Sequence, residues 1–86
     1  HPVAADVLLL IEVADASLAM DLRMKVPLYA RYRIPEVWVV DVVNRRVQRF
    51  AEPADDGYCH RSLLNLGDPA RVPGLADCSV DLRDLF

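Results

Sequence analysis

A short apolar run that ends on a carboxylate is the feature that most constrains the fold of this chain. Val7 to Ile11 are five consecutive aliphatic residues, and Glu12 follows them directly. A run of this length and branching predicts a β-strand over Val7–Val13 that is buried on both faces. A carboxylate at the end of such a strand is costly unless it is paired, hydrogen-bonded or bound to a cation. We therefore expect the Glu12 side chain to face a partner or a cleft.

A helix is predicted after this strand, over about Leu18 to Arg33. Asp15 and Ser17 supply N-cap chemistry in front of it. The helical period brings four of its apolar and aromatic side chains roughly to one side: Leu18, Leu22, Tyr29 and Tyr32. Pro27 lies inside the helix and lacks a backbone N–H, so we expect a kink or a fresh start at that residue.

The rest of the chain alternates extended runs with turn residues. We expect strands over Glu36–Val42, Val47–Phe50 and Tyr58–Leu64, a loop over Glu52–Gly57, and short extended pieces that end in a last turn at Asp81–Phe86. Trp38 in the first of these strands is expected in the core. A strand, a helix and then a meander of strands predict an α/β (α+β) fold with a central mixed sheet.

The size and composition of the chain limit the classes of protein to which it can belong. Its 86 residues allow one small domain, and 53% hydrophobic with 27% charged residues is a globular composition. The longest apolar run is far too short to span a membrane. Cys59 and Cys78 are too few for a disulfide framework or a zinc site, which favours a cytoplasmic protein. The first residues carry no initiating methionine, so we expect residues 1–86 to be one partial domain of a longer protein.

The charged residues are unevenly distributed along the chain. The net charge is −3, but residues 23–50 carry +5 between two acidic ends of −4 each. The total argues against strong general affinity for nucleic acid, and 7% aromatic residues supply no stacking platform for a nucleic-acid-binding domain without chemistry. The basic middle fits either a phosphate-facing surface or a solvated helix face.

Glu12, Asp21 and Lys25 allow two interpretations. Asp21 lies four residues before Lys25, so the two side chains can pair on one helix face, and all three residues can form a structural salt-bridge cluster. The alternative is nuclease chemistry. Phosphodiester cleavage uses carboxylates to hold Mg²⁺ and a cation near the attacking water. Glu12 supplies a carboxylate, and Lys25 supplies a cation.

An ordered set of motifs resembles the central block of the Uma-type restriction endonucleases in the PD-(D/E)XK superfamily. The family pattern is an apolar strand ending in Glu-Val, a serine, Asp-x-x-x-Lys, a tyrosine four residues on, a proline step and a Pro-Glu-x-Trp-x-Val-Asp strand. Its counterparts here are Glu12-Val13, Ser17, Asp21, Lys25, Tyr29, Ile34-Pro35, Glu36, Trp38, Val40 and Asp41. The closing segment VPGLADCSVDLRDLF also resembles that of the family. The resemblance implies a restriction-endonuclease-like fold, here its truncated C-terminal portion.

The resemblance also implies a role for each matching residue. Glu12 would be a catalytic residue that acts as the metal-ligating carboxylate of the (D/E)XK element, with Mg²⁺ or Mn²⁺ as cofactor and DNA as substrate. Position 14, where the superfamily lysine usually stands, is Ala14. Lys25 would therefore be the catalytic cation near the water and the scissile phosphate. Asp21 would orient Lys25, and Tyr29 would support the site or pack in the core, with packing favoured.

One departure from the family pattern leaves a second function open. The other metal ligand of the family is an aspartate in a Pro-Asp strand upstream of this block. Asp6 lies at the far end of the predicted strand, some 20 Å from Glu12 at about 3.3 Å per residue, which is too far to share an ion. The chain then carries half of a metal site. The alternative function is a non-catalytic remnant that serves as a folding or oligomerisation module, with a homo-oligomer as its assembled form.

Overall fold

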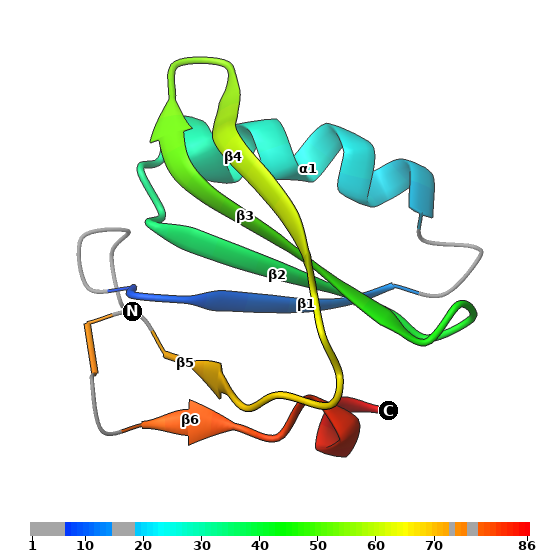
Figure 1. The fold of residues 1–86 in the computed structure, drawn as a ribbon. Helices are drawn as coiled ribbons and strands as arrows, with labels where there is room; N and C mark the ends of the chain where they lie inside the picture. The colour runs from blue at the N-terminus through cyan, green and yellow to red at the C-terminus, as the bar shows by residue number, and fades with distance from the viewer. Residues whose placement is uncertain (1–6, 15–18, 73, 76–77) are drawn as a thin grey trace.

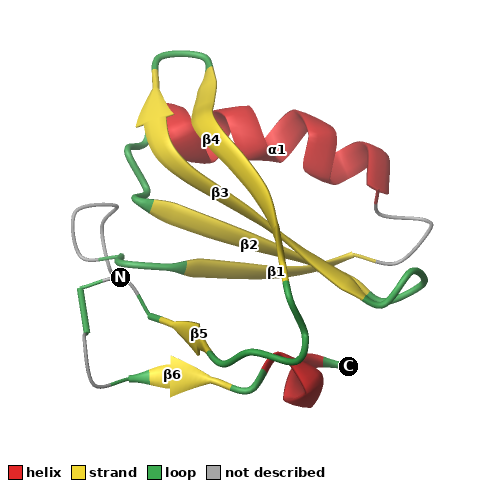
Figure 2. Cartoon of the chain, in the orientation of Figure 1, coloured by secondary structure: helices red, strands yellow, loops and turns green. Residues whose placement is uncertain are grey.

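Four strands form a sheet at the centre of the chain, with one helix on one face and the C-terminal segment on the other (Figures 1 and 2). The computed structural model describes residues 7–14, 19–72, 74–75 and 78–86, and for residues 14 and 19–23 it describes the backbone alone. The elements in chain order are β1 (Leu10–Ala14), α1 (Ala19–Arg31), β2 (Glu36–Asp41), β3 (Arg46–Ala54), β4 (Gly57–Leu64), β5 (Ala70–Arg71), β6 (Ser79–Val80) and the 3₁₀ helix η2 (Leu82–Leu85).

The sheet is mixed, as the order of the elements predicts. Its strand order is β1-β2-β3-β4, with β1 parallel to β2 and the other neighbours antiparallel. In the parallel pair, Ile11 lies opposite Trp38 and Glu12 lies opposite Val39. The α+β fold and the mixed sheet are therefore confirmed. No helix in the described residues is both long and apolar enough to cross a membrane.

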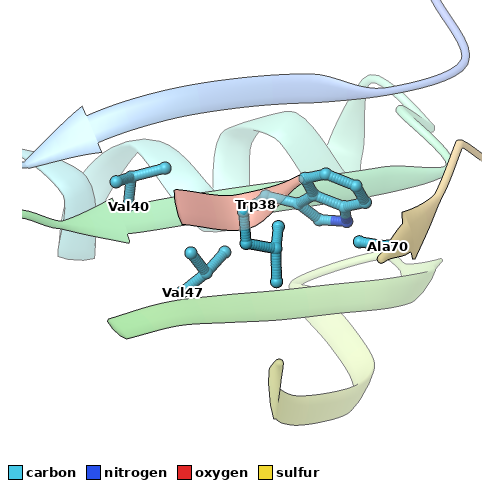
Figure 3. Packing of buried hydrophobic residues seen from close by; sticks show 5 residues of the cluster. Trp38, Val40, Val47 and Ala70 are labelled. Atoms are coloured by element: carbon cyan, nitrogen blue, oxygen red, sulfur yellow. The ribbon is translucent and has the colours of Figure 1, made fainter. Parts of the chain in front are cut away.

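The two faces of β2 belong to two separate hydrophobic clusters, because successive side chains of a strand point to opposite faces. Val37 and Val39 pack against α1, which contributes Val26 and Tyr29 to this cluster. Trp38 and Val40 point the other way and pack with residues of the C-terminal segment: Ala70, Val80, Leu82, Leu85 and Phe86. Figure 3 shows the Trp38 ring beside Ala70 of β5. The Trp38 side chain is 1% exposed, so the prediction that it lies in the core is confirmed.

β1 differs from the predicted strand in its bounds and in its burial. It begins at Leu10 rather than Val7, so Glu12 is the middle residue of the strand and not its end. Ile11 and Val13 are 38% and 53% exposed, so the prediction of burial on both faces is wrong. In the described part of the chain β1 pairs with β2 alone, and the C-terminal segment covers β2 to β4 instead. The strand that is buried on both faces is β2.

α1 runs through Pro27 as one helix, so the predicted fresh start at that residue is not observed. Tyr32 lies beyond the end of α1 and is 65% exposed, so its predicted place on the apolar side is wrong. Arg33 has φ of 60°, and the backbone N–H of Ile34 reaches back to the carbonyl of Tyr29 at 3.1 Å. A residue with left-handed backbone conformation, followed by a residue whose N–H makes this hydrogen bond, is the Schellman motif at the end of a helix. The predicted caps Asp15 and Ser17 lie outside the described residues.

β3 continues through the segment that was predicted as a loop. The strand β3 ends at Ala54, which pairs with Gly57 of β4. The two strands are therefore joined by a turn of two residues. Pro53 is tolerated because β2 pairs with β3 only as far as Ala51, which leaves one side of β3 without a strand beyond that point. The Pro53 carbonyl also accepts a hydrogen bond from Arg33 Nη1 at 3.1 Å. The prediction of a loop gave Pro53 and the acidic pair Asp55-Asp56 more weight than the pairing of β3 with β4.

Candidate functional site

Glu12 lies between the sheet and α1, and Tyr29 holds it there. The Tyr29 hydroxyl donates a hydrogen bond of 2.8 Å to Glu12 Oε1. Glu12 is half-buried. No other described residue donates a side-chain hydrogen bond to Glu12. The carboxylate is therefore held by one neutral donor on a flank that solvent can reach.

Tyr29 has both of the functions between which the sequence left a choice. Its ring packs against the cluster of Ile34, Val37 and Val39, while its hydroxyl contacts Glu12. Sequence reasoning favoured packing alone. The signal that points to the second function is spacing: Tyr29 lies four residues after Lys25, and residues so spaced are neighbours on one helix face.

Lys25 is exposed and lies one helical turn before Tyr29. Residues i and i+4 of a helix have Cβ atoms about 5–6 Å apart, so Lys25 lies on the side of α1 that Tyr29 presents to β1. Glu12 and Lys25 do not form an ion pair within 4.0 Å, and the hydrogen-bond partner of Glu12 is Tyr29 instead. The Glu12–Lys25 contact of a closed salt-bridge cluster is thus not present. Asp21 is on α1, but its side chain lies outside the described atoms, so its pairing with Lys25 remains a prediction.

A hard divalent cation fits Glu12 as one ligand of a larger set. Mg²⁺ takes oxygen ligands and commonly uses one or two carboxylates, with waters and substrate phosphates completing its shell. The described residues contain no group of three or more histidine, cysteine or acidic side chains that could hold a metal by themselves. Glu12 is half-buried and offers carboxylate oxygens, which is the donor chemistry that such an ion needs.

Tyr29 and Tyr58 should make the fold sensitive to alkaline pH. Burial, followed by the hydrogen bond to Glu12 and the charge of Glu12, raises the pKa of Tyr29 to about 12. Burial raises the pKa of Tyr58, whose hydroxyl donates to the Ile34 carbonyl, to about 12. The unfolded chain loses these protons first, so stability is fully present below about pH 10 and falls as the pH rises toward 12.

Denaturant unfolding at several pH values, with tyrosinate absorbance as a second signal, measures this loss. Tyr29→Phe keeps the ring and removes one of the two ionisations, so its free energy of unfolding should fall less steeply between pH 10 and 12. An identical slope in the wild type and the variant would show that Tyr29 does not hold its proton as described.

Comparison with known proteins identifies a family. The family profile of Uma2, which carries the description "Putative restriction endonuclease", matches residues 1–83. Searches of curated proteins and of solved structures found no significant match. The profile covers nearly the whole chain, and the mixed sheet with one helix is consistent with a restriction-endonuclease-like domain. The chain therefore belongs to the Uma2 family.

Proposed function

We propose that this chain is part of a divalent-metal-dependent DNA endonuclease that hydrolyses phosphodiester bonds. The observation that carries the proposal is the half-buried Glu12 carboxylate, which Tyr29 of α1 holds on the helix side of β1. Lys25 one turn away along α1 supplies positive charge to the same side. Membership of a restriction endonuclease family supports the proposal independently of this geometry.

Each residue of the site has a proposed role. Glu12 would hold Mg²⁺ or Mn²⁺, and the bound ion would activate a water and neutralise charge on the scissile phosphate. Lys25 would position that water and stabilise the negative charge that develops as the new P–O bond forms and the ester P–O bond breaks. Asp21, four residues before Lys25, would orient its ammonium group. Tyr29 is a positioning residue, since its hydroxyl fixes the carboxylate rather than the phosphate.

One acidic side chain is a sparse site for a nuclease metal. We propose that residues 1–86 form a partial domain, and that a second carboxylate from outside the described residues completes the metal shell. The competing proposal is a non-catalytic folding or oligomerisation module. It is supported by the exposed Ile11 and Val13 on β1, which pairs on one side only in the described part of the sheet.

Lys25→Met is expected to lower metal-dependent cleavage of supercoiled plasmid by about 100-fold or more, because it removes the cation and keeps the length of the side chain. Arg61→Met is the matched control. Arg61 is also exposed, but it lies on β4, at the opposite edge of the four-stranded sheet from β1 and Glu12. This control should cleave like the wild type. Equal losses in both variants would mean that charge in general, and not Lys25, supports cleavage.

The same assay should be run with Mg²⁺, with Mn²⁺ and with a chelator, on this chain and on a form extended upstream. Cleavage by the extended form alone would support a partial domain whose metal shell is completed from upstream. Cleavage by the 86-residue chain would show that its own residues complete the shell. Inactivity of both forms, together with a stable oligomer by size-exclusion chromatography with light scattering, would favour the non-catalytic module.

A further inference from the structure

A second polar cluster lies on the sheet face opposite Glu12. Glu36, the first residue of β2, is 6% exposed, and each of its carboxylate oxygens accepts one hydrogen bond. Arg49 Nη2 donates to Oε1 at 2.9 Å, and Trp38 Nε1 donates to Oε2 at 2.7 Å. The side chain of Glu36 is 8% exposed and that of Arg49 is 32% exposed. The ion pair therefore has a buried acidic end and a basic end that reaches the surface.

A pocket of about 380 Å³ opens beside this ion pair. Its lining includes Glu36 and Trp38 of β2, Arg49 of β3, Leu64 of β4 and Arg71 of β5. Pro69 and Ala70 complete the lining. Arg71 is exposed and forms no ion pair with any described residue. The lining thus contains two arginines from different elements, Arg49 of β3, which Glu36 holds, and Arg71 of β5.

The charge of the lining favours an anion. Arg49 and Arg71 carry two positive charges against the one negative charge of Glu36, and Asp68 just before Pro69 is exposed and is not part of the lining. Both oxygens of Glu36 already accept hydrogen bonds, one of them from Arg49, and the three charged side chains of the lining sum to +1. A guanidinium has five N–H donors, and Arg49 uses one of them on Glu36. The remaining donors of Arg49 and those of Arg71 can serve a ligand.

Two donors of β4 lie on the same face as Arg49. Ser62 is directly opposite Arg49, and His60 is opposite Ala51, two residues along the strand. Antiparallel partners point to the same face of a sheet, so Ser62 and His60 extend the donor surface next to the pocket. A hydroxyl and an imidazole N–H each donate to an anionic oxygen.

We propose that this pocket binds a phosphate group through Arg49 and Arg71. The planar fork of a guanidinium matches two phosphate oxygens, and Glu36 holds the Arg49 fork in place before the ligand arrives. The phosphate group belongs either to a small nucleotide or to a DNA backbone. The site lies across the sheet from Glu12, so it is separate from the proposed metal site and does not depend on nuclease activity.

Titration with inorganic phosphate tests this site, with ionic strength held constant by chloride. Trp38 is the only tryptophan of the chain and lines the pocket, so its fluorescence reports binding there. Wild-type protein should show a saturable change. Arg71→Ala should weaken the affinity at least tenfold, while Arg61→Ala removes an exposed arginine elsewhere and should leave the affinity unchanged. Thermal melting establishes that both variants are folded.

Glu12→Gln should bind phosphate like the wild type, so the result stands apart from any result on cleavage. The absence of a saturable Trp38 response would overturn the proposal, and so would equal affinities of the wild type and Arg71→Ala, or equal losses in Arg71→Ala and Arg61→Ala. Titrations with a nucleoside monophosphate and with a short DNA duplex then identify the source. The Arg71-dependent response should be tighter with the ligand whose phosphate the pocket accepts.

Discussion

Glu12→Gln is expected to reduce metal-dependent DNA cleavage by at least about 100-fold in the longest form of the protein that cleaves DNA. Glutamine keeps the shape of the side chain and still accepts a hydrogen bond from the Tyr29 hydroxyl. What it loses is the negative charge that a divalent cation requires. The free energy of unfolding should therefore change little while the cleavage rate collapses, and plasmid cleavage with denaturant unfolding measures both.

Asp56→Asn is the matched control for this variant. It makes the same chemical change at an exposed acid in the turn between β3 and β4, which forms no ion pair with any described residue and is far from β1 in the sheet order. Cleavage by the control should be unchanged. If Glu12→Gln cleaved DNA at the wild-type rate, Glu12 would not hold the metal and the proposed site would be wrong.

Glu36→Ala is expected to cause the largest loss of stability, about 3 kcal/mol in the free energy of unfolding. Removing this buried carboxylate leaves the Trp38 N–H without an acceptor in the core and leaves Arg49 without its counter-charge. Removing one member of a buried pair costs more than the pair itself contributes. Because a domain of this size has only some 4–13 kcal/mol of stability, the variant should unfold at a much lower urea concentration.

Two further variants separate the buried pair from ordinary surface charges. Replacing Glu36 and Arg49 together by leucine removes the pair without leaving a lone charge, so it should recover much of the lost stability. Asp55→Ala breaks the exposed Arg33–Asp55 pair, whose side chains are 56% and 93% exposed, and should cost less than about 1 kcal/mol. Circular dichroism follows the unfolding of each variant. Equal losses of unfolding free energy in Glu36→Ala and Asp55→Ala would refute the special role of the buried pair.

The elements were predictable where local pattern and pairing agree. β2 is a run of branched apolar residues around Trp38, and the prediction of Glu36–Val42 differs from the observed strand by one residue. The prediction failed where only pairing decides the structure. Pro53 and the acidic pair Asp55-Asp56 have strong loop character, yet β3 and β4 pair across them because the hairpin closes in two residues.

The sequence by itself determined the order of the elements, the mixed sheet and the family, because periodicity and ordered motifs are local properties of the chain. It also identified Glu12, Lys25, Asp21 and Tyr29 as candidates for one site. It did not determine the bounds of β1 and β3. Only the tertiary structure decided which side chains meet. The hydrogen bond from Tyr29 to Glu12 joins residues 17 positions apart, and Arg71 lines one pocket with Arg49 from a different element. Such contacts depend on how α1 and β5 pack against the sheet, and side-chain packing leaves no periodic pattern in the sequence.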